Sequence, residues 1–156
     1  MNIRKKGTII ISTFFYSGYF PFIPGTFASL IGVLLFALVS ANPPVYSLLT
    51  VVFIFLGFLS GTKAEEILKQ KDPKIVVIDE VAGMFLSFLF LPYYDIKVYV
   101  LGFLMFRILD TLKAFPAGKL QDLGGSKGIM MDDIIAAIYT NIILQVVFRM
   151  PSFIAS

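Results

Sequence analysis

The chain has 156 residues, of which 58% are hydrophobic and only 15% are charged, and its formal net charge at pH 7 is +3. Soluble domains are roughly half apolar and about a quarter charged, so this composition predicts an integral membrane protein. The sequence contains no cysteine and no histidine, which excludes disulfides, thiolate nucleophiles, zinc–sulfur sites and histidine bases. Any chemistry must use carboxylates, Lys, Arg, hydroxyls, backbone amides or a hard metal ion. The small positive charge is weak evidence for a nucleic-acid partner, and we expect none. The length fits one domain over residues 1–156.

The first residues predict a short helix at the membrane surface. Three basic residues at positions 4–6 precede the apolar stretch Thr8–Phe15, as in a signal peptide, but no small-residue cleavage site follows. We therefore expect a retained interfacial helix, with a cleaved or inert tail as the alternative. The next segment, Tyr19–Thr26, contains two prolines and a glycine, which predicts a break in helical structure that faces protein or water. Thr26 is expected to cap the helix that follows.

Apolar segments separated by turns and polar connections predict an all-α, polytopic membrane bundle with about five spans. The turn at Asn42-Pro43-Pro44, the polar connection Lys63–Lys74, the turn Pro92–Asp95 and the Gly- and Lys-rich loop Ala114–Met131 separate these segments. At 1.5 Å per residue, the first span covers only ~22 Å of the ~30 Å hydrocarbon core. The expected spans are Phe27–Ala41, Val45–Gly61, Ile75–Leu91, Ile96–Lys113 and Asp132–Arg149.

Basic residues gather in the loops on one side of this predicted bundle. The N-terminus holds three and Lys63–Lys74 holds four, whereas the opposite turns hold only Lys97 and the C-terminus adds Arg149. The loop after the fourth span contributes Lys113, Lys119 and Lys127. The positive-inside rule therefore predicts a cytoplasmic N-terminus and an external C-terminus. Four polar motifs then fall at the cytoplasmic face: Pro24-Gly25-Thr26, Asp79-Glu80, Arg107–Lys113 and Asp132-Asp133.

These motifs predict one polar site. Arg107, Asp110 and Lys113 lie on neighbouring faces of a helix, and charges at membrane depth are functional by default because they are costly there. The paired acids Asp79-Glu80 and Asp132-Asp133 would repel each other in a low dielectric unless a cation lies between them. Oxygen ligands suit a hard ion such as Mg²⁺. Arg and Lys beside such a cluster would bind phosphate oxygens.

A glycine-rich turn at residues 124–128 precedes the second acidic pair, and such a turn offers backbone amides to an anion. Together with a metal and basic residues it indicates a phosphoryl-transfer site, in which metal-bound water replaces histidine as the source of the nucleophile. Each motif also has an ordinary interpretation. In that interpretation, Arg107 and Asp110 form only a local i,i+3 ion pair. Each acidic pair would then cap a helix N-terminus, and the glycines would only mark a loop.

Four segments resemble the bacterial phosphatidylglycerophosphatase A family in order and separation. They are PFIPGTFASL, VVIDEVAGMFL, FRILDTLKAFPAGKL and GIMMDDIIAAI, and the resemblance spans roughly Pro21 to Ile138. It implies a magnesium-dependent lipid phosphatase of the bacterial cytoplasmic (inner) membrane, with its active site on the cytoplasmic face. The substrate would be phosphatidylglycerophosphate, whose terminal phosphate is removed to give phosphatidylglycerol. The segment Ala114–Ala117, the glycine turn with one extra residue, and Ala137 depart from the family pattern, but none of these changes removes a charged group.

The resemblance places the family motifs on residues of this chain. Its D-E and D-D pairs fall on Asp79, Glu80, Asp132 and Asp133, its R-x-x-D-x-x-K motif on Arg107, Asp110 and Lys113, and its P-G-T on Pro24, Gly25 and Thr26. We expect the four paired acids to hold Mg²⁺ and Arg107 and Lys113 to bind phosphate. Asp110 would orient Arg107, bind metal or act as a base. We expect the substrate to be enclosed by Pro24, Gly25, Thr26, Gly125, Lys127 and Gly128.

The residues leave alternatives open for both the chemistry and the function. A phospho-aspartyl intermediate is the alternative to direct attack by water, although the D-x-D pattern of haloacid-dehalogenase phosphatases is absent. A CDP-alcohol phosphotransferase would need a D-G-x-x-A-R motif, which is also absent. The alternative from another class is a small membrane cation transporter that uses the acidic cluster, but transporters place ionisable groups near the midplane rather than at one face. A non-catalytic scaffold is a third interpretation.

Overall fold

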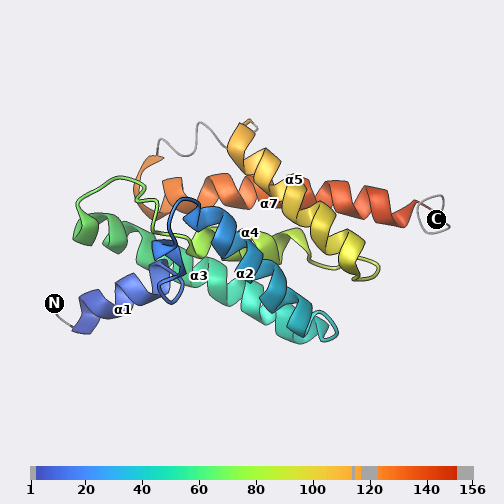
Figure 1. The fold of residues 1–156 in the computed structure, drawn as a ribbon, viewed down its shortest axis with the longest axis horizontal. Helices are drawn as coiled ribbons and strands as arrows, with labels where there is room; N and C mark the ends of the chain where they lie inside the picture. The colour runs from blue at the N-terminus through green and yellow to red at the C-terminus, as the bar shows by residue number, and fades with distance from the viewer. Residues whose placement is uncertain (1–2, 114, 117–122, 151–156) are drawn as a thin grey trace.

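A computed structural model describes residues 3–113, 115–116 and 123–150, and within these ranges all regular structure is helical (Figure 1). The predicted all-α fold is therefore confirmed. The elements are α1 (Ile3–Ser12), the 3₁₀ turn η1 (Ser17–Tyr19), α2 (Pro24–Val39), α3 (Pro43–Leu68), α4 (Ile78–Ser87), α5 (Ile96–Leu112) and α7 (Gly125–Arg149). α4 contacts α2, α3, α5 and α7, so the shortest of the major helices forms the centre of the fold.

Two helices, α3 and α7, are long and apolar enough to cross a membrane, while α2 is apolar but shorter. The side chain of Asn42 caps α3 by accepting a hydrogen bond from the backbone N–H of Val45 at 3.3 Å. α3 and α7 pack closely because α3 carries glycine at the contact. A Cβ on Gly61 would lie 2.9 Å from the Cα of Ser126 on α7, so a side chain there would force the two helices apart.

The predicted third span, Ile75–Leu91, is wrong in its extent. α4 has only 10 residues, which corresponds to about 15 Å, or half of a ~30 Å hydrocarbon core. The prediction failed because the apolar sequence continues after the helix ends at Ser87. Eight of the ten residues of α4 are buried, so the helix is enclosed by protein on all sides.

The non-helical backbone after α4 is hydrogen-bonded by side chains from elsewhere in the chain. Asn141 Nδ2 on α7 donates to the carbonyls of Ser87 at 3.0 Å and Leu89 at 2.9 Å. Gln145 Nε2, one turn further along α7, also donates to the carbonyl of Leu89, at 3.1 Å. Irregular backbone is tolerated in an apolar environment only when its polar groups are satisfied in this way. α7 therefore holds the end of α4 in place.

Other predicted boundaries also shift. α2 begins at Pro24 with Ile23 at the N-cap and no side-chain cap, so the expectation that Thr26 caps this helix is wrong. α7 begins at Gly125 and not at Asp132, because the backbone N–H groups of Gly125 and Ser126 bond to Glu65 and Thr62 of α3. In the predicted loop Ala114–Met131, Lys119 lies outside the described residues.

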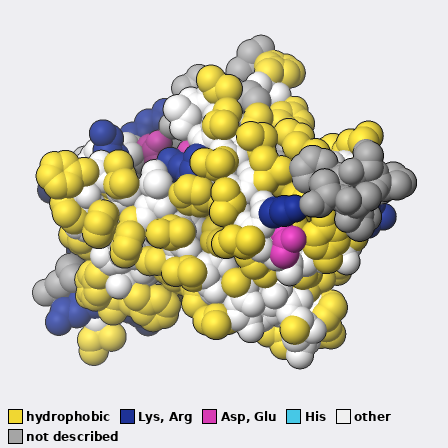
Figure 2. Space-filling view, turned by 45° about the vertical axis from the view of Figure 1, so that its right-hand side comes forward, with side chains coloured by type: hydrophobic (Ala, Val, Ile, Leu, Met, Phe, Trp, Pro, Cys, Tyr) yellow, Lys and Arg dark blue, Asp and Glu magenta, His cyan; other side chains and the backbone are white. Residues whose placement is uncertain are grey.

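The outer surface of the helices is strongly apolar. Figure 2 shows a face covered largely by hydrophobic side chains, with charged side chains toward the left edge, at its upper and lower ends, and a smaller charged group on the right. Exposed hydrophobic residues occur on each of the four longer helices, for example Leu38 of α2 (81% exposed), Leu48 of α3 (64%), Leu112 of α5 (71%) and Ile142 of α7 (53%). Soluble monomers rarely expose contiguous apolar surface of this extent.

Candidate active site

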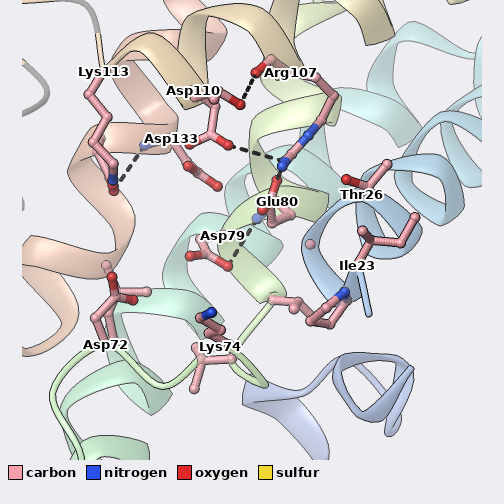
Figure 3. A pocket seen from close by; sticks show the side chains of 17 residues that line it. Ile23, Thr26, Asp72, Lys74, Asp79, Glu80, Arg107, Asp110, Lys113 and Asp133 are labelled. Atoms are coloured by element: carbon pink, nitrogen blue, oxygen red, sulfur yellow. Dashed lines mark hydrogen bonds and ion pairs between the residues drawn. The ribbon is translucent and has the colours of Figure 1, made fainter. Parts of the chain in front are cut away.

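One cavity at an end of the helix bundle collects all three charged motifs and the Pro-Gly-Thr motif (Figure 3). Its walls are the N-terminus of α2, the segment before α4, the first turn of α4, the C-terminal end of α5 and the N-terminal part of α7. The volume is about 430 Å³, within the ~300–1,000 Å³ typical of ligand sites. The charged side chains that line it are Asp72, Lys74, Asp79, Glu80, Arg107, Asp110, Lys113, Asp132 and Asp133.

α4 presents its two acids to the cavity from its first turn. Asp79 Oδ1 accepts the backbone N–H of Glu80 at 3.0 Å, which fixes the orientation of the Asp79 carboxylate. The chain enters this turn from a segment held by α1, because the backbone N–H of Val77 donates to the carbonyl of Ser12 at 2.9 Å. The N-terminal helix thus supports the site from behind.

α5 contributes its basic residues at its C-terminal end. Arg107 and Asp110 are one turn apart and their side chains form an ion pair at 3.1 Å. Lys113 ends the helix in the left-handed conformation, with φ of 47°, which is uncommon for a residue with a side chain. From this position its Nζ donates to Asp132 Oδ2 at 2.9 Å. Asp132 therefore neutralises Lys113 across the cavity.

A polar network joins α2, α4 and α5 at the base of the cavity. Glu80 Oε2 forms a short ion pair with Arg107 Nη1 and accepts the hydroxyl of Ser29 at 2.9 Å. Ser29 is fully buried, and Arg107 Nη1 also approaches its hydroxyl oxygen at 3.4 Å. Gly25 lets the Glu80 side chain pack closely against α2, because a Cβ at position 25 would collide with Glu80 Oε1 and displace that carboxylate. Gly25 and Ser29 lie one turn apart on the same face of α2, and both contact the Glu80 carboxylate.

Three carboxylates form a candidate metal site. One oxygen each from Glu80, Asp110 and Asp133 lies within 4.8 Å of the others. Asp133 is 4% exposed, and within the described residues its Oδ2 is buried without a hydrogen-bond partner. Leaving such an atom unpaired costs about 1–3 kcal/mol or more. The cavity lining also carries six acidic side chains against three basic ones. An oxygen-ligated divalent cation fits both the empty lone pairs and the excess negative charge.

The structure brings together most of the predicted site residues. Asp79, Glu80, Arg107, Asp110, Lys113, Asp132, Asp133, Pro24, Gly25 and Thr26 all line the cavity. Gly125, Lys127 and Gly128 do not belong to this lining. The backbone N–H of Gly125 instead donates to Glu65 Oε2 at 2.9 Å, so this amide binds a carboxylate of the protein itself rather than an anion in the cavity. Asp110 joins the three-acid cluster, whereas Asp132 is paired with Lys113.

The structure bears differently on the ordinary interpretations of these motifs, namely helix capping by the acidic pairs and a local Arg107–Asp110 ion pair. Asp132 and Asp133 lie about two turns inside α7, too far from its N-terminus to act through the helix dipole, whose influence falls off within the first turn. Helix capping therefore does not explain this pair. Asp79 and Glu80 do lie in the first turn of α4. The Arg107–Asp110 pair is an i,i+3 ion pair, but it is also part of the network that contains Glu80.

Sequence reasoning missed several residues of the cavity. Ser29 was not singled out, although its spacing of four from Gly25 gave a helical signal that could have found it. Lys74 was interpreted only as a determinant of membrane topology, yet it lines the cavity on the side away from Arg107 and Lys113. Asp72 and Thr111 also belong to the lining. No pattern in the sequence distinguished Lys74 from the other lysines of its segment.

Comparison with known proteins identifies the family. The sequence profile described as phosphatidylglycerophosphatase A matches residues 10–148. A Bacteroides thetaiotaomicron protein named "Putative phosphatidylinositol-3-phosphatase" is 34% identical over 146 residues, covering 88% of this chain and 91% of its own. Phosphatidylglycerophosphatase A of Escherichia coli is 32% identical over 131 residues (83% of this chain, 76% of its own), and that of Haemophilus influenzae is 30% identical over 140 residues (86% and 85%). No solved structure gives a significant match. The chain therefore belongs to the phosphatidylglycerophosphatase A family and is a phosphatase.

Proposed function

We propose that this protein is a magnesium-dependent membrane enzyme that hydrolyses the terminal phosphate of phosphatidylglycerophosphate to give phosphatidylglycerol. The observation that carries the proposal is the cluster of Glu80, Asp110 and Asp133 beside two basic side chains. Family membership and the relatives' names support this substrate. Magnesium is supported by the oxygen-only ligand set and by Asp133 Oδ2, which is buried and has no hydrogen-bond partner among the residues that the structure describes.

In this proposal Glu80, Asp110 and Asp133 hold the cation, with Asp79 and Asp132 at its edge. A divalent cation bound there would offset charge on the phosphate oxygens and lower the pKa of a bound water. Asp110 has two roles, because it also forms the 3.1 Å ion pair that orients Arg107. Asp132 holds Lys113 over the cavity through their 2.9 Å contact.

The phosphate would be held by basic groups around the same cavity. Within the described residues, the side-chain hydrogen bonds of Arg107 all start from Nη1, which leaves Nη2 and Nε for a bidentate contact with phosphate. Lys74, which is exposed at the cavity rim, adds a third positive charge. Pro24, Gly25 and Thr26, at the N-terminus of α2, complete the cavity lining. Since Gly125, Lys127 and Gly128 lie outside the lining, this proposal gives them no contact with substrate.

The proposed location is the bacterial cytoplasmic membrane. The length of α3 and α7 and the apolar outer faces of α2, α3, α5 and α7 support it. In this arrangement α4 is a buried half-span, so four helices rather than five cross or nearly cross the bilayer. The basic residues of α1 and of the segment before α4 favour a cytoplasmic site and a cytoplasmic N-terminus under the positive-inside rule.

A second candidate substrate is phosphatidylinositol 3-phosphate, because of the name of the Bacteroides thetaiotaomicron relative. Both lipids are phosphate monoesters, and the proposed cation and basic groups contact the phosphate in either case. The difference between the two lies in the alcohol next to the phosphate. A direct comparison of the two lipids as substrates decides between them.

The test measures phosphate release from both lipids by the purified full-length protein in detergent, with magnesium or with EDTA. The site variant is Asp133→Asn, and the matched control is Asp95→Asn, which makes the same chemical change at the N-cap of α5. Magnesium-dependent release from phosphatidylglycerophosphate that the control retains and the site variant loses supports the proposal. Equal release in EDTA would overturn it, and no release by folded protein would favour the cation transporter.

A further inference from the structure

A second cavity, an apolar groove, lies between α2 and α5. Its volume is about 360 Å³, within the ~300–1,000 Å³ typical of ligand sites. It contains no charged side chain. Its lining residues are Leu30, Val33, Leu34 and Ala37 of α2 and Ile96, Tyr99, Val100, Phe103 and Leu104 of α5.

The groove continues the wall of the acidic cavity along the same two helices. On α2, Ser29 reaches the polar network and Val33, one turn later, lines the groove. On α5, Arg107 lines the acidic cavity and Phe103, one turn earlier, lines the groove. The 3.4 Å contact between Arg107 Nη1 and Ser29 Oγ joins the helices at this boundary. The lining between α2 and α5 therefore changes from charged to wholly apolar within one helical turn.

The dimensions of the groove match one leaflet of a bilayer. Its lining runs from Leu30 to Ala37 on α2 and from Leu104 to Ile96 on α5, which at 1.5 Å per residue corresponds to about 10–12 Å. Half of a ~30 Å hydrocarbon core is about 15 Å. Leu34 and Val100 are 58% and 50% exposed, so the groove opens sideways along its length and a chain can enter it from the lipid.

We propose that this groove binds an acyl chain of the lipid phosphate monoester whose head group occupies the acidic cavity, and this inference rests on the proposed function. A lipid that reaches the site from the bilayer must expose its phosphate to Arg107 while its chains remain in an apolar environment. The groove meets that need because it begins one turn from Arg107. The groove contributes affinity through burial of the chain and fixes the lipid at the depth that brings its phosphate to the cation cluster.

The first test narrows the groove. Val100→Trp adds a large side chain to the groove lining, and Val51→Trp makes the same change on α3, where Val51 is 65% exposed and outside the groove. KM is measured for dioleoyl and dihexanoyl forms of phosphatidylglycerophosphate. We expect the preference for the long-chain lipid, expressed as the ratio of the two KM values, to fall about 10-fold in Val100→Trp and to stay unchanged in Val51→Trp. An unchanged ratio in both variants, or an equal fall in both, would overturn the inference.

A second test uses the unaltered protein and so does not depend on the folding of a variant. A lipid phosphate monoester with a photoreactive group in one acyl chain is cross-linked to the full-length protein in detergent, with and without excess unlabelled substrate. Labelling of the α2 and α5 groove residues that the competitor removes supports the inference. Equal labelling of outward residues such as Leu48 of α3 would mean that bulk lipid fills the groove, and labelling that leaves the groove residues unmodified would mean that the acyl chain does not enter it. Either result contradicts the inference, whereas competed groove labelling without phosphate release contradicts the proposed reaction alone.

Discussion

The two ends of α4 differ in how their polar groups are satisfied. At the C-terminal end, the backbone carbonyls that follow the helix receive neutral donors from Asn141, Gln145 and Tyr94. At the N-terminal end, the acids of the helix meet further acids from α5 and α7, and the buried Oδ2 of Asp133 has no partner within the described residues. Both ends lie in an apolar bundle, where unsatisfied polar groups are expensive.

This difference separates a structural polar region from a functional one. A polar region that serves only stability is expected to be neutral and fully hydrogen-bonded, as at the C-terminal end of α4. The N-terminal end instead brings the carboxylates of Glu80, Asp110 and Asp133 close together. Their mutual repulsion destabilises the protein without a cation and would be relieved when a cation binds between them. Substitutions at the two ends should therefore have opposite profiles, with losses of activity at one end and losses of stability at the other.

The largest effect is expected from Asp133→Asn. Removing one negative charge from the cation cluster should lower phosphate release by about 100-fold or more, comparable to the loss of a principal electrostatic group in other active sites. The melting temperature in EDTA should not fall, because Asp133 Oδ2 accepts no hydrogen bond from the part of the chain that the structure describes. Phosphate-release assays and thermal unfolding check both points. A large drop in melting temperature with intact activity would show that the N-terminal end of α4 serves stability rather than function.

At the other end, Asn141→Leu should act on stability. The substitution removes the side-chain donor of the Ser87 carbonyl and one of the two donors of the Leu89 carbonyl, which keeps Gln145, and a buried acceptor left unsatisfied costs about 1–3 kcal/mol. Thermal unfolding in detergent should show the loss, while the activity of the folded fraction should remain within about two-fold, since small effects are expected far from the reacting groups. Complete inactivation of well-folded protein would show that this end also takes part in the reaction.

A smaller effect is expected from Arg107→Lys, which keeps the charge but removes the planar fork. Loss of bidentate contact with the phosphate should lower kcat/KM about 10-fold. The reduced ion pairing with Glu80 and Asp110 adds to this loss. Steady-state kinetics check the prediction, with Lys97→Arg on the far end of the same helix as a control. A variant with unchanged kcat/KM would mean that Arg107 acts only as a counter-ion.

The smallest effect is expected from Ser29→Ala. Glu80 loses one hydrogen bond of 2.9 Å but keeps its ion pair with Arg107. A hydrogen bond to a charged group is worth about 1.5–3 kcal/mol at most, and partial compensation by Arg107 should limit the loss of activity to about 5-fold. Rescue by Ser29→Thr, which restores the hydroxyl, would show that the hydroxyl positions Glu80. A failure of Thr to restore activity would indicate a packing role instead.

The sequence predicted that its charged motifs gather in one place, for a physical reason. Charges are so costly in an apolar chain that their positions reveal where function lies, and Arg107, Asp110 and Lys113 all line the cavity. The helix that carries them was also predicted closely, at Ile96–Lys113 against Ile96–Leu112. Its N-terminus is marked by Asp95, whose side chain caps it.

What the sequence could not predict depends on contacts between distant segments. The end of α4 at Ser87 is set by Asn141 and Gln145 of α7 rather than by a local signal. α7 begins early because α3 binds the amides of its glycine-rich first turn, although glycine has low helix propensity. The composition of the three-acid cluster depends on side-chain direction across three helices, which explains why the sequence left the role of Asp110 open among three possibilities.

The most direct test of the cation cluster is the binding of Mn²⁺, as a spectroscopic substitute for Mg²⁺, measured by electron paramagnetic resonance on the purified full-length protein. We expect about one tightly bound ion per chain that Mg²⁺ displaces. Asp133→Asn should lose this binding and Asp95→Asn should retain it. Binding of the same strength in Asp133→Asn, or no binding by a wild-type protein that still releases phosphate in EDTA, would contradict the account of the acidic cavity as a cation-dependent phosphatase site.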